Sequence, residues 1–215
     1  MTASKLGRFI TLEGIEGAGK STVARHLGEW LGARGVRVCL TREPGGTVLA
    51  ERVRNIVLER GAETVTPITE TLLMFAARGI HLETLIRPAL ARGEWVVCDR
   101  FTDATRAYQA GGRGVSRTLI DELARAVHPT LAPDCTLLLD LPVEVGLARS
   151  KMRSGNIPRD RFEAEPAVFF ERVRAAYLEL ARQEPKRFQI IDAGVPLPDV
   201  EQQVASALRH ILDST

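Results

Sequence analysis

The chain has 215 residues, of which 45% are hydrophobic and 26% are charged, and its formal net charge is +2. These values are typical of one globular domain with a sizeable core, and they exclude a chain dominated by disorder. Because no block of like charge stands out in the sequence, we expect neither a nucleic acid nor a membrane surface among its partners.

Short apolar runs alternate with longer amphipathic stretches along the chain. The predicted strands are Phe9–Leu12, Val36–Leu40, Trp95–Cys98, Thr136–Leu139 and Gln189–Ile191. Such short and nearly continuous apolar runs are typical of strands that are buried on both faces. Helical spacing follows Lys20, begins again near Pro67, and recurs around Val168–Leu180 and Val200–Ile211. The alternation predicts an α/β fold, a doubly wound five-stranded parallel sheet flanked by helices.

Polar side chains gather where three of the predicted strands end. The clusters are Glu13–Thr22, Thr41–Thr47 and Asp99–Arg113. Because ligands of such sheets bind beyond the carboxyl ends of the strands, these clusters predict one binding site at that edge. A further polar stretch, Ser150–Glu165, lies between two predicted helices. It predicts a mobile flap, or LID, at about residues 150–165 within a single domain of residues 1–215.

Residues 14–21 read Gly-Ile-Glu-Gly-Ala-Gly-Lys-Ser, which fits the phosphate-loop pattern G-x-x-x-x-G-K-[ST] between a predicted strand and a predicted helix. Its glycines let successive N–H groups point at phosphate oxygens, and the helix adds its positive N-terminal end. Lys20 supplies a point charge for the β- and γ-phosphates. We expect ATP to contact Gly14, Ile15, Glu16, Gly17, Ala18, Gly19, Lys20, Ser21 and Thr22. The sequence has no Asn-Lys-x-Asp guanine reader, which disfavours a GTPase.

Asp99 ends a predicted strand and is followed by Arg100. A carboxylate at this position faces the phosphate loop, so we expect Asp99 and the Ser21 hydroxyl to hold Mg²⁺ as the cofactor of ATP. Phosphoryl transfer also needs positive charge around the in-line oxygens, which the planar fork of arginine supplies. Candidate arginines at the right ends of the predicted elements are Arg42, Arg54, Arg78, Arg100, Arg153, Arg159 and Arg161.

Several motifs resemble the thymidylate kinase family over nearly the whole chain. They are Leu12-Glu13-Gly14 before the loop, Thr41-Arg42-Glu43-Pro44-Gly45-Gly46-Thr47, Phe75-Ala76-Ala77-Arg78, Asp99-Arg100-Phe101, Thr105-Arg106-Ala107-Tyr108-Gln109 and Asp160-Arg161-Phe162-Glu163. The resemblance implies a P-loop nucleoside monophosphate kinase fold and a homodimer. The implied activity is transfer of the γ-phosphoryl group of ATP to dTMP, which gives dTDP on the way to dTTP.

The resemblance also implies roles around the acceptor phosphate and sugar. Glu16 is implied to accept a hydrogen bond from the deoxyribose 3′-hydroxyl. Arg54 and Arg100 are implied to clamp the monophosphate, with Glu43 close by. Tyr108 is implied to fill the space that a ribose 2′-hydroxyl would need, which would select deoxynucleotides by exclusion.

Further roles implied by the resemblance concern the two bases. Arg78 is implied to donate a hydrogen bond to thymine O4, and Thr105 and Gln109 to contact the edge of the thymine. Arg149 is implied to stack on adenine, which the backbone around Ala193–Val195 would also touch.

One departure from the family pattern concerns the cover of the thymine ring. Many relatives carry a phenylalanine one helical turn before the thymine-reading arginine, whereas this chain has Met74 followed by Phe75. Either Met74 covers the base or a rotated helix presents Phe75, and the sequence leaves both open.

Some members of the family carry an arginine inside the phosphate loop, but the variable positions here hold no cation. Charge on the transferring group must then be neutralised from elsewhere, and an arginine-rich LID of the bacterial type is the natural source. We expect Arg153 first, and Arg161 or Arg159 next, to stabilise the transition state; Arg161 could instead form a salt bridge that shapes the hinge. The predicted catalytic residues are Lys20, Asp99, Arg100, Arg153 and Arg161.

The cysteines and histidines show no functional pattern. Cys39, Cys98 and Cys135 each lie inside an apolar run, which predicts small, buried, reduced thiols. The four histidines have no metal-ligand spacing, so we assign them no catalytic role. The polar segment Met1–Arg8 is unlike a signal peptide, and no apolar run approaches the ~20 residues that span a bilayer. We therefore expect a cytoplasmic protein.

Two other functions stay open at this point. One is a related P-loop kinase that acts on another deoxynucleotide or on a nucleoside. The other is a P-loop switch ATPase, which would need a partner surface in place of a second substrate pocket. The clusters at Arg42–Thr47 and Asp99–Arg113 supply such a pocket and favour the kinase.

Overall fold

The computed structural model describes residues 7–61, 63–154 and 160–213. Its centre is a five-stranded sheet in the order β2-β3-β1-β4-β5, and every neighbouring pair of strands is parallel. The strands are β1 Phe9–Glu13, β2 Val38–Arg42, β3 Trp95–Asp99, β4 Cys135–Asp140 and β5 Phe188–Asp192. All five predicted strands and the doubly wound α/β class are confirmed. β2 begins two residues later than predicted, because Val36 still belongs to the turn after the first helix and donates to Leu31 O.

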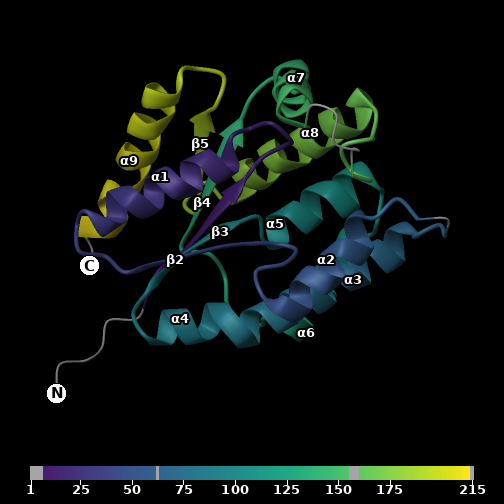
Figure 1. The fold of residues 1–215 in the computed structure, drawn as a ribbon, viewed down its shortest axis with the longest axis horizontal. Coiled ribbons are helices and arrows are strands. Elements are labelled where there is room, and N and C mark those ends of the chain that lie inside the picture. The colour runs from purple at the N-terminus through teal and green to yellow at the C-terminus, as the bar shows by residue number, and fades with distance from the viewer. Residues whose placement is uncertain (1–6, 62, 155–159, 214–215) are drawn as a thin grey trace.

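Helices cover both faces of the sheet (Figure 1). The α-helices are α1 Lys20–Gly32, α2 Val48–Leu58, α3 Pro67–His81, α4 Arg87–Ala91, α5 Thr102–Thr105, α6 Arg117–Val127, α7 Val143–Ser154, α8 Ala167–Gln183 and α9 Leu197–Asp213. Two π-helical segments, η1 Leu82–Ile86 and η2 Arg106–Gly112, join α3 to α4 and extend α5. The helix predicted from Pro67 is therefore three consecutive segments. None of the described helices is both long and apolar enough to cross a bilayer.

Side chains of the central strand alternate between two packed layers, as the pleat of a strand requires. Ile10 and Leu12 of β1 pack toward α1 in the larger core, which also contains Leu27 and Leu31. Phe9 points to the other face and joins a smaller cluster with η1 and α4. All of these side chains are buried. The sheet is therefore a rigid base for the loops at its carboxyl edge.

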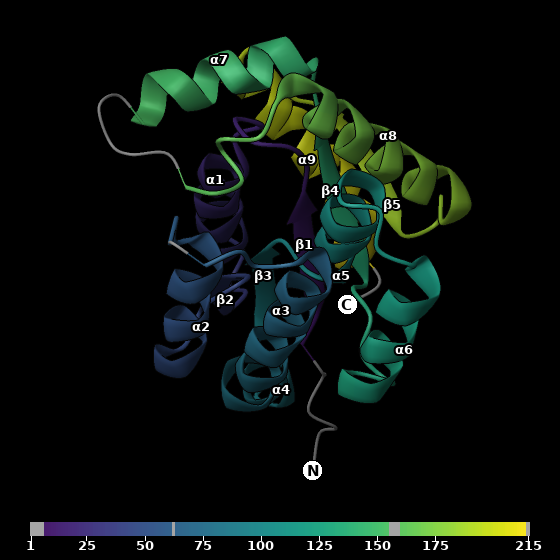
Figure 2. The same ribbon diagram turned by 90° about the vertical axis from the view of Figure 1, so that its right-hand side faces the viewer.

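Those loops lead into the helices that surround the carboxyl edge. Thr47 caps α2 through its hydroxyl, and Thr66 caps α3, where Pro67 occupies the first turn. Side-chain caps of this kind satisfy N–H groups that a helix leaves unpaired. α2 and α3 pack side by side across the molecule from α7 (Figure 2). The phosphate loop, the loop after β2 and the segment after β3 meet between them.

Candidate active site

A cleft of about 500 Å³ lies at the carboxyl edge of the sheet, a volume within the usual range for small-molecule sites. The three polar clusters of the sequence all contribute to it, together with α2, α3 and the end of α7. Its lining includes Glu16, Lys20, Ser21, Thr22, Arg42, Glu43, Arg54, Met74, Arg78, Asp99, Arg100, Thr105, Tyr108, Gln109, Arg153, Asp160 and Phe162. The fold thus brings together side chains from distant parts of the chain.

The phosphate loop curls over the end of β1 in the predicted way. Gly14, Gly17 and Gly19 have φ angles of 138°, 73° and 87°, in the region that favours glycine. A Cβ at Gly17 would also collide with the Gly146 carbonyl of α7. Ile15 and Ala18 bury their side chains in the core, so only their backbone can face a phosphate.

Lys20 is buried at the start of α1, and its Nζ donates to Gly14 O at 3.1 Å and to Ile15 O at 2.9 Å. Burial and the charge of Arg100 lower the pKa of Lys20, and neighbouring carboxylates compensate only in part. The ammonium is thus held at the loop that would cradle the phosphates.

Ser21 and Asp99 meet across the switch point between β1 and β3. Ser21 Oγ donates to Asp99 Oδ2 at 3.1 Å. A hydroxyl and a carboxylate are hard oxygen ligands, and Mg²⁺ sites on nucleotides use one or two such protein groups beside phosphates and water. The pair fits the predicted metal.

Arg100 has the one positive φ angle, 74°, among the described non-glycine residues. Its Nη2 donates to Glu16 Oε2 at 2.7 Å and to the Tyr108 hydroxyl at 2.9 Å, and its Nη1 donates to Gly14 O at 3.0 Å. A left-handed backbone at such a residue costs about 1–3 kcal/mol and persists only where surrounding contacts fix it. Burial raises the pKa of Glu16, but the charges of Arg100 and Lys20 outweigh this and hold it below its usual range.

Glu13 and Tyr177 connect the end of β1 to the segment after β3 and to α8, although the sequence assigned neither residue a role. Glu13 is fully buried and accepts hydrogen bonds from Phe101 N at 2.8 Å and from the Tyr177 hydroxyl at 2.6 Å. Burial, followed by the nearby charge of Asp103, raises the pKa of Glu13 to about 8. A carboxyl group that ends an apolar strand was the available signal for Glu13. Tyr177 has helical spacing on α8 and is indistinguishable in sequence from a core residue.

Arg78 is 2% exposed and reaches the cleft from α3. Its Nη2 donates to Phe101 O at 3.1 Å and to Thr105 Oγ1 at 3.0 Å, while its Nε donates to Glu43 Oε2 at 2.7 Å. Its Nη1 is buried and has no hydrogen-bond partner in the part of the chain that the structure describes. A buried guanidinium nitrogen without a partner needs an explanation, and the Arg78 side chain lines the cleft, so a bound ligand is one candidate acceptor.

Glu43 lines the same cleft as Arg54 and Arg100, and its carboxylate contacts Arg78 and His81. His81 Nδ1 lies 3.0 Å from Glu43 Oε1, and its Nε2 lies 2.7 Å from Thr41 Oγ1. Burial raises the pKa of Glu43. The charge of Arg78 and the hydrogen bond with His81 outweigh burial, so the pKa lies below its usual value. The sequence assigned no role to His81, whose side chain is fully buried in this network.

The rotation of α3 about its axis distinguishes Met74 from Phe75 as the residue that could cover the thymine ring. Met74 lines the cleft, whereas Phe75 is buried in a small core with Val115 and Ile120. The Phe75 ring centroid also lies 4.7 Å from the Arg78 guanidinium carbon. The prediction that Phe75 contacts a ligand is therefore corrected, and Met74 is the candidate.

Of the predicted LID arginines, Arg153 lines the cleft and Arg161 does not. Arg153 is 65% exposed at the end of α7, lines the cleft, and lies 3.5 Å from Glu163 Oε1. Arg161 instead bonds the carbonyl groups of Val57 and Val65, and its Nη2 lies 2.9 Å from Glu70 Oε2. Arg161 is thus outside the cleft, which corrects its predicted catalytic place and favours the salt-bridge alternative, with Glu70 as the partner. Arg159 lies outside the described residues.

Arg54 lies on α2 and Arg149 lies on α7. Arg54 Nη1 donates to Pro44 O at 2.8 Å and its side chain lines the cleft. Arg149 Nη1, on α7, donates to Ala193 O at 2.7 Å. The two regions that the sequence assigned to adenine, Arg149 and the loop after β5, therefore lie in contact.

Three comparisons with known proteins bear on this geometry. The sequence model of a family described as thymidylate kinase matches residues 12–204. A thymidylate kinase of Pseudomonas fluorescens (strain SBW25) is 55% identical over 207 residues, which are 96% of this chain and 97% of that protein. One of Ectopseudomonas mendocina (strain ymp) is 54% identical over 208 residues, covering 97% and 98%. The crystal structure of thymidylate kinase from Ehrlichia chaffeensis matches the fold with a TM-score of 0.75 and 35% identity, covering 94% of this chain and 99% of that one.

Proposed function

The chain belongs to the thymidylate kinase family, and from this premise we propose that it transfers the γ-phosphoryl group of ATP to dTMP. The products are ADP and dTDP, on the way to dTTP. The observation that carries the proposal is that a phosphate loop and the unpartnered donor Arg78 Nη1 share one cleft. The first group binds a triphosphate, and the second can bind a carbonyl oxygen of an acceptor base.

On the donor side, backbone N–H groups of residues 14–22 and the Lys20 ammonium hold the β- and γ-phosphates. Ser21 and Asp99 would hold Mg²⁺, which when bound neutralises developing charge on the phosphate oxygens. Arg149, which is tied to the loop after β5, is the candidate to stack on adenine.

On the acceptor side, the role of Arg100 is to bind the monophosphate together with Arg54. Arg100 is held in place by Glu16 and Tyr108, so little reorganisation is needed when the phosphate arrives. Glu16 remains the candidate acceptor for the 3′-hydroxyl, and Tyr108 the residue that excludes a 2′-hydroxyl.

The thymine is then the part of the substrate nearest α3 and η2. Arg78 Nη1 donates to thymine O4, Thr105 and Gln109 line the base edge, and Met74 covers the ring. All four residues lie on the wall of the one cleft.

In the reaction a phosphate oxygen of dTMP attacks the γ-phosphorus in line. The new P–O bond forms as the bond to the β–γ bridging oxygen of ATP breaks, and that oxygen leaves with ADP. The attacking oxygen already carries negative charge, so positioning and neutralisation of charge dominate catalysis. Arg153, which lines the cleft from the end of α7, is the LID cation that can add charge stabilisation at the transferring group.

The decisive experiment is an ADP-release assay with MgATP and each natural nucleoside monophosphate in turn. The proposal predicts dTMP as the preferred acceptor. Preference for another deoxynucleotide would establish the related kinase, and ATP hydrolysis that no nucleotide acceptor stimulates would establish the switch ATPase.

We further propose that the protein is a cytoplasmic homodimer. Five large apolar side chains are exposed on the adjacent helices α2 and α3, namely Val48, Leu49, Ile56, Ile68 and Leu72. Burial of such side chains between two copies would be favourable. The three cysteines are unpaired, in keeping with a reducing compartment. A sedimentation measurement of the molecular mass tests the dimer.

A further inference from the structure

Gln109 and Glu70 are in contact at the base end of the cleft. Gln109 belongs to η2 and lines the cleft, whereas Glu70 lies on α3, where its side chain is 1% exposed. Gln109 Nε2 donates to Glu70 Oε1 at 2.7 Å. One end of the amide is therefore held by a buried carboxylate, and the other end is the one that a ligand can reach.

The surroundings of Glu70 fix the direction of this hydrogen bond. Arg161 Nη2 lies 2.9 Å from Glu70 Oε2, and Arg113 Nε lies 3.5 Å from Oε1. Two guanidinium groups thus supply the counter-charge to the carboxylate, and an ionised carboxylate has acceptors only. The amide of Gln109 must present its NH₂ group to Glu70, so its carbonyl oxygen must point the other way.

We propose that Glu70 is a positioning residue that fixes the Gln109 carbonyl toward the base and thereby selects pyrimidines that carry N3–H. The inference rests on the proposed function. A free glutamine side chain can offer either end of its amide, because donor and acceptor exchange places when the amide turns over. Contact with Glu70 removes that freedom, since the turned amide would set its oxygen against a buried carboxylate.

Arg78 completes a pair of oriented groups in the same cleft. Its unpartnered Nη1 is a donor, held through Glu43, and the Gln109 carbonyl is an acceptor held through Glu70. Thymine and uracil present the matching pair at neighbouring positions, with O4 as acceptor and N3–H as donor. Cytosine presents the reverse pair, with an amino group at C4 and a lone pair at N3. Both oriented groups would therefore be left unpaired by dCMP.

The test compares kcat/KM for dTMP, dUMP and dCMP in the wild type and in Glu70→Gln. A neutral amide at position 70 can donate or accept, so it no longer dictates how Gln109 is turned. We expect the dTMP/dCMP ratio to fall by ~10-fold or more, as one base-reading contact loses its direction. The dTMP/dUMP ratio should stay within about twofold, because both bases carry O4 and N3–H, and the KM for ATP should not change.

A purely structural role of Glu70 predicts a different result, because loosening of the site would lower kcat/KM for all three acceptors in parallel. A dTMP/dCMP ratio that stays within about twofold of the wild-type value would overturn the inference. The matched control is Glu179→Gln, the same change at an exposed carboxylate on α8 that accepts a hydrogen bond from Gln183 Nε2 and does not line the cleft. Its dTMP/dCMP ratio should equal that of the wild type.

Two further variants locate the effect at Gln109. Gln109→Leu should lower the dTMP/dCMP ratio by itself, with the part read by Arg78 remaining, and addition of Glu70→Gln to it should change the ratio no further. If Glu70→Gln does not fold, Glu70→Asp gives the same comparison, since it keeps the charge but withdraws the carboxylate from the amide.

A wild type that does not use dTMP would reject the proposed function and this inference together. A wild type that prefers dTMP, with an unchanged ratio in the variants, would reject the inference alone.

Discussion

Ser21 Oγ lies 3.1 Å from Asp99 Oδ2, although the two residues are 78 positions apart in the sequence. One belongs to the first turn of α1 and the other ends β3, and the parallel pairing of β1 with β3 sets Leu12 beside Asp99. The carboxyl ends of two neighbouring strands thus present a hydroxyl and a carboxylate to the same point of the cleft.

Asp99→Asn should weaken the binding of Mg²⁺ at this point of the cleft. The amide keeps the shape of the side chain but loses the negative charge that attracts Mg²⁺. We expect a loss of ~10²-fold or more in kcat/KM at low Mg²⁺, partly restored at high Mg²⁺. Titration of the rate with Mg²⁺ checks this, and addition of EDTA should stop the wild type. Asp134→Asn, at the opposite edge of the sheet, is the control and should titrate like the wild type.

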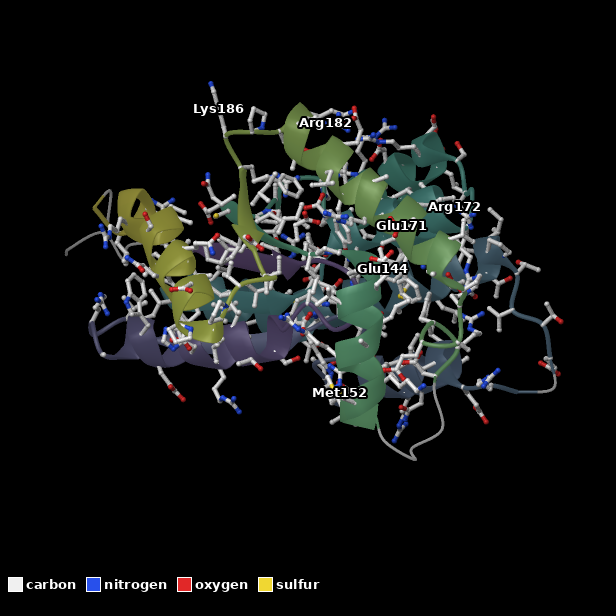
Figure 3. The ribbon with its side chains drawn as sticks, turned by 90° about the horizontal axis from the view of Figure 1, so that it is seen from above. Glu144, Met152, Glu171, Arg172, Arg182 and Lys186 are labelled. Carbon is white, nitrogen blue, oxygen red and sulfur yellow. The ribbon has the colours of Figure 1, made fainter. Side chains whose placement is uncertain are left out.

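Lys20→Ala should abolish phosphoryl transfer while the protein remains folded. The ammonium is the point charge of the phosphate loop, and no other lysine lines the cleft among the described residues. Turnover and circular dichroism should be measured on the same preparation. Lys186→Ala is the matched control, because Lys186 points away from the molecule in the turn before β5 (Figure 3). Turnover of Lys20→Ala near the wild-type value would remove the phosphate loop from the mechanism.

Arg153→Ala should lower kcat by ~10²-fold with little change in KM, the signature of a contact made only in the transition state. Arg161→Ala should instead mainly lower the melting temperature, because its guanidinium holds α2 and α3 to the C-terminal part of the LID. Arg182→Ala, which changes a 72% exposed arginine on α8, is the control and should alter neither quantity (Figure 3). If Arg153→Ala keeps kcat within a few-fold of the wild type, Arg100 and Lys20 must supply the charge.

Met74 and Phe75 should respond in opposite ways to truncation. Met74→Ala removes part of the cleft wall, so we expect the KM for dTMP to rise several-fold while stability falls by less than in Phe75→Ala, because Met74 is only partly buried. Phe75→Ala leaves a hole in a buried cluster, and large-to-small changes of this kind cost about 3–5 kcal/mol of unfolding free energy. Steady-state kinetics and urea unfolding of both variants separate the two roles. The reverse pattern would mean that Phe75 covers the thymine.

Stability should depend on pH through Glu13. Its pKa in the folded protein is raised to about 8 from an ordinary 4.5, so between these values the folded chain keeps a proton that the unfolded chain has released. Stability must then fall as pH rises from about 5 to 8, by up to about 1.4 kcal/mol per pH unit. Urea unfolding of the wild type and of Glu13→Gln at several pH values measures this. The advantage of the wild type over the variant should shrink as pH rises, and a difference independent of pH would show an ionised Glu13.

The sequence by itself determined the class of fold and the donor half of the site. Apolar runs such as Trp95–Cys98 identify buried parallel strands, and the loop from Gly14 to Ser21 carries its chemistry in adjacent residues. Both signals are local, because the period of a strand and the curl of a glycine loop depend on neighbours in the chain. Resemblance to the family then indicated most of the residues that line the acceptor half.

Some pairs of residues look equally suitable in the sequence, and only the tertiary structure decided which member of each pair faces the cleft. The rotation of α3 puts Met74 in the cleft and Phe75 in the core, and contacts with α2 and α3 draw Arg161 away from it while Arg153 stays. His81 is likewise tied to Glu43 only through packing of α3 against the loop after β2. The order of residues in the sequence does not predict these contacts. Each contact depends on which group from a distant part of the chain comes within hydrogen-bonding distance after folding.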